Sequence, residues 1–235
     1  MSAAASTSIV NALIDGLPHK LRRGFLDRCE RIDLTMGTAL CCADEAFQYG
    51  YFPLSGFISL VINLGHRPPL ELGLIGNEGM LGATLALGVN GAPSLAIVQG
   101  AGTALRMPAE QLRRELRDCP ALRRIVRRYL YVQMAQLSRS AACMHFHEVA
   151  PRLARWLLMT HDRAHIDHFH LTHELLADML GVRRSGVTIA AGALKNRKLI
   201  SYARGQIKVL NRKGLEAASC ECYGATLGDY SRVFA

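Results

Sequence analysis

Short apolar runs separated by glycines and turn residues fill residues 34–108. The runs over 52–62 and 70–75 are apolar or alternate between apolar and polar positions, and further runs follow over 94–99 and 103–107. Runs of this length, bounded by turn residues, are typical of β-strands. The pattern therefore predicts an antiparallel β-roll of the jelly-roll type.

The pattern changes to a helical period over residues 120–143, where apolar positions recur every three or four residues and arginines occupy the outer face. A long amphipathic helix must bury its apolar stripe, and a second copy of the same helix can cover it. A further helix is predicted over 149–160, around Trp156. We expect the long helix to form a dimer seam through seven residues: Leu122, Ile125, Val126, Tyr129, Leu130, Gln133 and Leu137.

Residues 171–194 have the spacing of a helix-turn-helix. Two helices that cross steeply over a tight turn need apolar residues at their contact and a glycine that can adopt a positive φ. Gly181 lies at that turn, and Thr172 can cap the first helix. The second helix starts with two arginines and a serine, whose side chains suit contact with base edges and phosphates. An ordinary pair of packed helices has similar patterning, so charge has to decide between the two.

The excess positive charge lies in the half of the chain that holds this motif. Residues 1–118 contain 10 Lys and Arg against 11 Asp and Glu, whereas residues 119–235 contain 18 against 8. A basic region around a helix-turn-helix is an electrostatic footprint for a polyanion, and double-stranded DNA is the candidate. A membrane surface is not favoured, because no basic amphipathic helix carries an aromatic apolar face.

Two short strands are expected directly after the second helix, over 199–203 and 206–210, around Arg204-Gly205. Glycine at this turn permits a tight hairpin. A hairpin in this place is a wing, whose tip would present Arg204 to the phosphate backbone. The expected DNA contacts are Thr172, His173, Arg183, Arg184, Ser185, Val187, Thr188, Lys195, Arg204, Gly205 and Lys208.

The cysteines and the N-terminus bear on the cellular compartment. Seven cysteines without an export signal indicate reduced thiols in a cytoplasm. The uncharged stretch 79–98 contains glycines and a proline that would break a membrane helix.

Cys41-Cys42 and Cys220-x-Cys222 lack the CxxC spacing of a metal or redox motif, so no metal site is expected. Redox sensing through the cysteines stays an alternative.

The order of β-roll, long helix and winged helix resembles the cyclic AMP receptor and fumarate-nitrate regulator (CRP/FNR) family of bacterial transcription factors. The likeness is strongest in LTHELLADMLGVRRSGVT, LISYARGQIKVLNRKGLE and CECY, and weaker in YFPLSGFISLV and IGNEGMLG. The expected fold is α+β. It has four parts: a cyclic-nucleotide-binding-like roll over 1–118, a dimerisation helix over 119–146, a winged helix-turn-helix over 147–223 and a C-terminal tail over 224–235.

The resemblance implies a homodimer whose recognition helices enter successive major grooves of a two-fold symmetric DNA site, about 34 Å apart. RNA polymerase is a candidate further partner. Arg184 matches the family's base-reading arginine, which can donate two hydrogen bonds to guanine. Ser185 and Ile189 replace a glutamate and an arginine that are common in the family, so we expect a different preferred sequence. Arg183 replaces the usual capping serine, which leaves the first turn to phosphate or water.

The sensor part departs from the family pattern. Cyclic-nucleotide binding in this family uses a glutamate on the ribose and an arginine on the phosphate, and residues 79–98 contain neither. Cyclic AMP is therefore not expected to bind. The N-terminal cysteine cluster of an iron–sulfur sensor is absent too, whereas haem needs no motif and stays open. The expected effector-pocket residues, which offer only backbone N–H groups and small side chains, are Gly79, Gly82, Thr84 and Ser94.

Histidines between residues 161 and 173 are the sequence's candidate for a metal or enzyme site. Their close spacing permits metal ligation, and a metal-dependent hydrolase is the alternative function. No catalytic motif accompanies them, because the chain has no GxSxG, Walker, glycine-fingerprint or HExxH sequence. We therefore expect that the protein is not an enzyme. A polar loop is expected for His161, His165, His168, His170 and His173.

Overall fold

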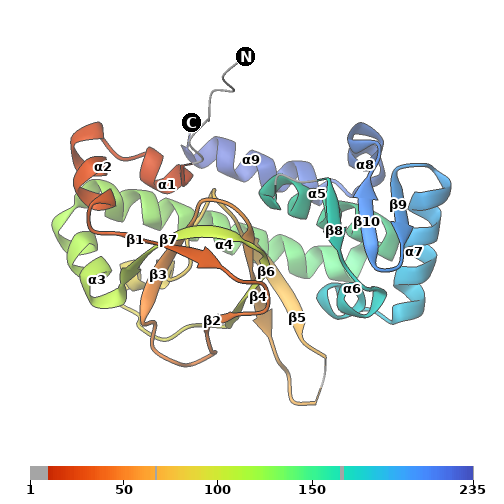
Figure 1. Ribbon diagram of the computed structural model, residues 1–235, viewed down its shortest axis with the longest axis horizontal. Coiled ribbons are helices and arrows are strands. Elements are labelled where there is room, and N and C mark those ends of the chain that lie inside the picture. The colour runs from red at the N-terminus through yellow and green to blue at the C-terminus, as the bar shows by residue number, and fades with distance from the viewer. Residues whose placement is uncertain (1–9, 67, 165–166, 235) are drawn as a thin grey trace.

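The strands of the N-terminal half fold into two antiparallel sheets (Figure 1). The computed structural model describes residues 10–66, 68–164 and 167–234. One sheet has the order β2-β6-β4-β5 and the other has the order β1-β7-β3. Gly56, at φ +72°, turns the chain between β3 and β4. The strands are β1 Glu30–Leu34, β2 Ala39–Cys41, β3 Tyr49–Pro53, β4 Phe57–Ile62, β5 Leu70–Ile75, β6 Leu95–Gly100 and β7 Gly102–Pro108.

Short helices flank this roll and close its core. Phe52, Ile58 and Met107 are fully buried between the sheets and the helices. The roll predicted from the apolar runs is thus confirmed, with shifts of a few residues at the strand ends. The flanking elements are α1 Ala12–Asp15, α2 His19–Leu26, the 3-10 helix η1 Ala83–Leu87 and α3 Ala109–Asp118.

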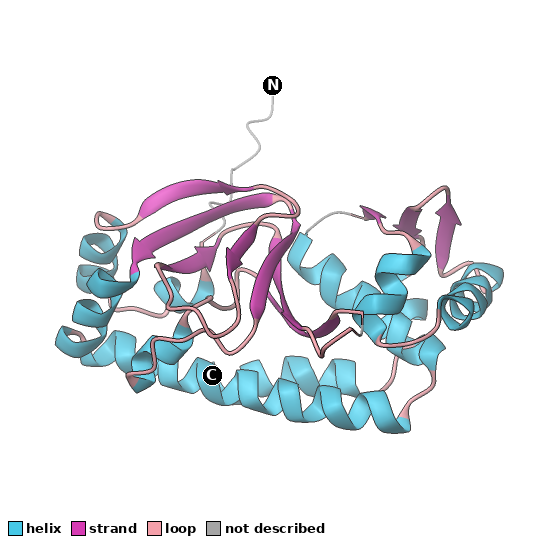
Figure 2. Ribbon diagram, turned by 90° about the horizontal axis from the view of Figure 1, so that it is seen from below, coloured by secondary structure: helices cyan, strands magenta, loops and turns pink. Residues whose placement is uncertain are grey.

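Helix α4, Pro120–Phe146, runs the length of the molecule beneath the roll and on to the second domain (Figure 2). Proline at its first position suits a helix start, because its missing N–H would have no partner there. Leu122, Val126 and Tyr129 on this helix are buried in the core of the roll. Helix α9, Cys222–Phe234, packs along another face of α4.

The C-terminal half forms a winged helix-turn-helix with its own core. A three-stranded sheet of order β8-β10-β9 lies against α5, α6 and α7 (Figure 1). The expected α+β fold is confirmed, but most of the expected tail, residues 224–235, belongs to helix α9. The elements are α5 Val149–Ala164, β8 His168–His170, α6 His173–Leu180, α7 Arg184–Asn196, β9 Ile200–Ala203, β10 Gln206–Val209 and α8 Arg212–Ala218. In the described part of the chain, every helix is too short or too polar to cross a bilayer.

Candidate nucleic-acid interface

The turn between α6 and α7 has the backbone that a helix-turn-helix needs. Gly181 ends α6 at φ +62°, a left-handed conformation that glycine adopts without strain. Its N–H donates to the carbonyl of Asp178 at 3.1 Å. At the start of α6, the hydroxyl oxygen of Thr172 accepts a hydrogen bond from the N–H of Leu175, also at 3.1 Å. The predicted cap and the predicted glycine turn are therefore both present.

The inner face of α7 belongs to the core of the domain. Val187 is 0% exposed and packs in one cluster with Trp156, Leu176 and Leu194. A side chain without exposed surface cannot reach a DNA base. The expectation that Val187 contacts DNA is wrong, because this position holds α7 onto the domain.

The outer face and the first turn of α7 are open to solvent. Arg184, Ser185 and Thr188 are exposed, as the sequence predicts for base or phosphate contacts. Arg183 stands at the N-cap, and its side chain accepts no hydrogen bond from the first N–H groups of the helix. Such free N–H groups, together with the helix dipole, favour an anion such as a phosphate. Ile189 is 74% exposed on the same face, where an apolar side chain could contact a thymine methyl group.

His173 connects α6, α7 and the wing. Its Nδ1 lies 3.0 Å from the hydroxyl oxygen of Thr188, and that hydroxyl donates its proton to the carbonyl of Arg184 at 3.1 Å. Its ring stacks on Tyr202 of β9 at 4.4 Å between centroids and 10° between planes. Desolvation and, to a smaller extent, the Arg184 guanidinium lower the pKa of His173. A neutral ring held on both sides suits a residue that positions the recognition helix.

The predicted wing is present as a two-residue hairpin. Strands β9 and β10 pair antiparallel, with Ala203 opposite Gln206. Arg204 and Gly205 have φ angles of +49° and +77°, the combination that the tightest hairpin turns need. Arg204 is exposed at the tip.

The wing and the recognition helix form the two sides of one groove. Six of its lining residues come from β8, α6, α7 and the wing: His170, Thr172, His173, Arg184, Tyr202 and Arg204. Two arginines therefore face this groove from opposite sides. Lys195 and Lys208 are exposed outside it, and the ammonium of Lys195 lies 3.4 Å from the carbonyl oxygen of Tyr202.

The histidines upstream of the motif do not form the expected polar loop. His168 and His170 lie on β8, which pairs with β10 and buries Phe169 between them. His161 lies on α5, where its Nε2 is 2.8 Å from a carboxylate oxygen of Asp167. His165 lies outside the described residues. Over residues 10–66, 68–164 and 167–234, these histidines do not come together as a metal-ligand set.

The expected effector pocket is an apolar cavity of about 230 Å³ between the roll and α4. Gly82, Thr84 and Ser94 line it, together with Leu130, Met134 and Leu137 of α4. Gly79 does not line the cavity, because it faces Tyr129, whose ring leaves no space for a Cβ atom. No charged side chain lines this cavity in the described part of the chain.

The expected dimer seam includes residues that the protomer buries itself. Leu122 and Val126 are 0% exposed and Tyr129 is 1% exposed, so these three cannot contact a second copy. Their apolar stripe packs against the roll instead. Ile125, Leu130 and Gln133 are partly exposed, and Leu137 is exposed. The most exposed apolar side chains in the middle of the helix are Tyr131 at 59% and Met134 at 63%.

Sequence reasoning missed one polar cluster. Cys143, His147, Cys220 and Cys222 offer ligand atoms that all lie within 4.8 Å of one another. Cys143 and His147 are more than 70 residues from Cys220 and Cys222 in the chain, so no local spacing predicts the cluster. The one local signal in the sequence is the pair Cys220-x-Cys222, which lacks the CxxC spacing of a metal motif.

Comparison with known proteins identifies the C-terminal domain. Residues 151–218 match the Crp-like helix-turn-helix domain family. No curated protein matches the chain.

Solved structures of transcription regulators share the fold. The c-di-GMP-responsive global regulator CLP of Xanthomonas campestris aligns with a TM-score of 0.66 and 16% identity, over 82% of this chain and 99% of that chain. FixK2 of Bradyrhizobium japonicum aligns with a TM-score of 0.65 and 16% identity, over 82% and 98%. A CRP-family transcriptional regulator of Thermus thermophilus aligns with a TM-score of 0.63 and 20% identity, over 83% and 96%. The resemblance that the sequence indicates is thus confirmed at the level of fold and C-terminal domain.

Proposed function

We propose, from a Crp-like helix-turn-helix domain carried on the fold of CRP/FNR regulators, that this chain is a sequence-specific DNA-binding transcriptional regulator that acts as a homodimer. One observation carries the proposal. Arg184 on the recognition helix and Arg204 on the wing line the same groove, in the half of the chain that holds all the excess positive charge. That placement of two exposed guanidinium groups suits a groove edge and a phosphate backbone.

Arg184 is the residue that we assign to base recognition. Its side chain is 71% exposed, and its nearest acidic neighbour, Glu174, lies 3.8 Å away and is equally exposed. An exposed pair at that distance is weak, so the guanidinium can turn to the O6 and N7 atoms of a guanine. Arg204, Lys195 and Lys208 supply contacts to phosphates, which raise affinity for all sequences alike.

The homodimer would use a face of α4 that the roll covers only in part, since Met134 and Leu137 are 63% and 40% exposed. Leu130, Met134, Leu137 and Ala141 are spaced four, three and four residues apart, which is the heptad spacing of a two-stranded coiled coil. This seam keeps Leu130 and Leu137 of the predicted seam. It leaves out Leu122 and Tyr129, because the roll covers the face on which they lie. Two copies joined here would place two recognition helices on a two-fold symmetric DNA site.

The roll would serve as the sensor, with a ligand other than cyclic AMP. The cavity is lined mostly by apolar side chains, and its polar side chains, Thr84, Ser94 and Gln133, are uncharged. A cyclic phosphate placed there would be desolvated without a cation, which is strongly unfavourable. An uncharged apolar effector fits this lining, and it would touch the seam residues Met134 and Leu137.

Selection of random DNA duplexes by the purified chain tests the proposed function. We expect a two-fold symmetric motif with half-sites about one helical turn apart and an affinity that falls steeply with salt. Recovery of no enriched sequence, with no binding to any duplex at low salt, would contradict it. A motif without two-fold symmetry would contradict only the homodimer.

A further inference from the structure

Three buried cysteines and a histidine meet where α4 ends. Cys143 lies in the last turns of α4 and His147 caps its C-terminus. Cys220 lies between α8 and α9, and Cys222 is the first residue of α9. The four side chains therefore join the end of the long helix to the end of the DNA-binding domain.

The distances in this cluster match those around a single tetrahedral metal ion. The sulfur atoms of Cys143 and Cys220 are 3.6 Å apart, and the sulfur of Cys222 is 3.7 Å from Nδ1 of His147. A zinc ion with Zn–S bonds of about 2.3 Å holds its ligand atoms roughly 3.8 Å apart at the corners of a tetrahedron. An iron–sulfur cluster spreads its ligands around several iron atoms, so four ligand atoms within 4.8 Å are too close together for one.

The orientation of His147 distinguishes this cluster from ordinary packing of thiols. Nδ1 faces the sulfur of Cys222, whereas Nε2 lies 3.1 Å from a carboxylate oxygen of Glu221. A carboxylate that accepts from the far nitrogen is the usual partner of a metal-binding histidine, because it fixes the tautomer and the ring orientation. Packing of three cysteines alone would need neither the ring nor the carboxylate.

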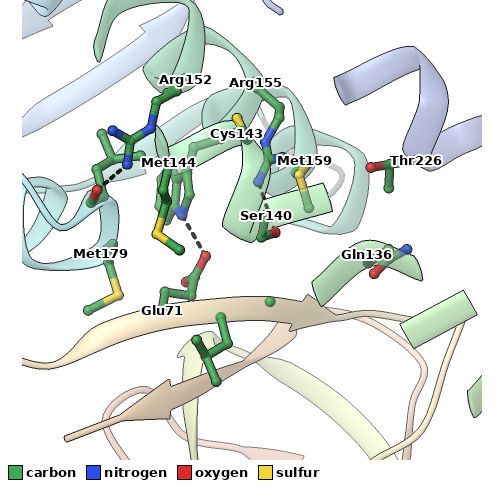
Figure 3. Close-up of a pocket in the computed structure, with 14 residues that line it drawn as sticks. Glu71, Gln136, Ser140, Cys143, Met144, Arg152, Arg155, Met159, Met179 and Thr226 are labelled. Atoms are coloured by element: carbon green, nitrogen blue, oxygen red, sulfur yellow. Dashed lines mark hydrogen bonds between the residues drawn. The ribbon is translucent and has the colours of Figure 1, made fainter. Parts of the chain in front are cut away.

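Positive charge lies beside the cluster. Three thiolates, a neutral imidazole and a divalent ion carry a net charge of −1. Arg152 and Arg155 line the pocket at the domain boundary together with Cys143. Figure 3 shows Cys143 on the same side of the pocket at the domain boundary as these two arginines. The surroundings therefore suit an anionic metal site.

We propose that Cys143, His147, Cys220 and Cys222 bind one Zn²⁺ ion. Three cysteines and one histidine form a closed structural zinc set, which has no open position for a substrate. The ion would link the junction between α4 and α5 to the segment between α8 and α9. It would thereby fix the orientation of the DNA-binding domain on the dimerisation helix. This last effect rests on the proposed function, whereas ion binding itself does not.

The test measures metal in the full chain, purified with a thiol reductant that does not chelate zinc. Elemental analysis should give about one zinc per chain, and exchange with Co²⁺ should give the intense visible absorption of a tetrahedral thiolate site. The double variant Cys220→Ser, Cys222→Ser should lose the ion, whereas Cys42→Ser, at an exposed cysteine away from the cluster, should keep it. Because the double variant alters two buried positions and can misfold, Glu221→Gln serves as a milder change that should weaken zinc binding about 10- to 100-fold.

Several results would overturn the proposal. One is a chain that retains no metal from zinc-supplemented buffer while all four ligands are unmodified. Another is a Cys143–Cys220 disulfide in thiol-blocked protein taken directly from the producing cells, which would make the pair a redox switch instead. A full equivalent of zinc in the double variant would place the ion elsewhere. None of these results depends on DNA binding, so failure of the metal site and failure of the proposed function are distinguishable.

Discussion

The indole N–H of Trp156 on α5 donates a hydrogen bond to the Glu71 carboxylate on β5 at 2.8 Å, across the boundary between the roll and the DNA-binding domain. The hydroxyl of Ser59 donates to the second carboxylate oxygen at 2.7 Å. Desolvation raises the pKa of Glu71 to about 7, although both hydrogen bonds oppose this shift. A second link across the boundary is the ion pair between Glu78 and Arg163, at 2.7 Å. The contact between the two domains therefore contains a carboxyl group that changes its charge near neutral pH.

Glu71→Gln should change how stability depends on pH. The folded-state pKa of about 7 lies above the unfolded value of 4.5, so the folded chain holds a proton that the unfolded chain releases between these values. The free energy of unfolding therefore falls as pH rises through this window, by about 3 kcal/mol for the whole shift. Glutamine stays neutral, and its amide can still accept from Trp156. We expect the variant to be more stable than the parent at pH 8 and nearly equal to it at pH 4.5.

Denaturant unfolding at several pH values measures this effect. Glu45→Gln, at an exposed carboxylate, is the control and should change the free energy of unfolding by less than about 0.5 kcal/mol at each pH. A parent and a Glu71→Gln variant with parallel pH profiles would show that Glu71 does not take up a proton on folding.

Arg184→Ala and Arg204→Ala should weaken DNA binding in different ways. Loss of a base contact should cost about 1–3 kcal/mol on the selected site and relax the preference at one base pair of each half-site. Loss of a phosphate contact at the wing should weaken all sequences similarly and reduce the slope of log affinity against log salt by about 1. Competition binding over a salt series separates the two. The control is Arg31→Ala, an exposed arginine in the roll, which should change neither quantity. The same loss on specific and random DNA for both variants would contradict the roles assigned to them.

The winged helix-turn-helix was predictable because its signals are local. Gly181, Thr172 and Arg204-Gly205 each determine a turn or a cap within a few residues, and the structure has all three. The roll was predictable for the same reason, since glycines and turn residues mark the ends of its strands.

The burial of α4 was not predictable from periodicity. A helical stripe shows that an apolar face exists, but it does not say whether the roll or a second copy covers that face. In the structure, Leu122, Val126 and Tyr129 pack against the roll. The prediction that Val187 contacts DNA is wrong for a related reason, because a residue within a recognition helix can face the core.

The cysteine cluster was not predictable from the sequence for a different reason. Cys143 and Cys220 are 77 residues apart, and they meet because α8 packs on α5 and α9 packs along α4. The sequence offers no pattern for a contact that depends on tertiary structure. The same holds for the expected tail, whose helix is anchored by the ion pair between Arg139 on α4 and the buried Asp229.

Met134→Lys should make the protein monomeric if the proposed homodimer uses this seam. Met134 is 63% exposed at the centre of the proposed seam, so lysine there leaves the protomer core intact but places two like charges against each other in the dimer. We expect a monomer at micromolar concentration by sedimentation, and weaker binding to the full two-fold site than the parent shows. Met36→Lys is the matched control, because Met36 is 56% exposed on the roll, away from α4. A Met134→Lys variant that remains dimeric would place the seam on another surface.

Cyclic AMP should not bind to the protein and should leave its Tm unchanged. The phosphate would enter a cavity whose polar side chains, Thr84, Ser94 and Gln133, carry no charge, so its desolvation would go uncompensated. If the nucleotide bound with a Kd of about 10 μM, a concentration of about 1 mM would stabilise the folded state by roughly 2.7 kcal/mol. For a chain of this size, that stabilisation would raise the Tm by roughly 5–10 °C. We expect a change of less than about 1 °C in a thermal scan and no heat of binding in calorimetry. The selected DNA duplex, added to the same protein, should raise the Tm and so show that the sample is competent to bind. A micromolar calorimetric isotherm with cyclic AMP would mean that the cavity supplies a cation or N–H groups to the phosphate in a conformation different from this one.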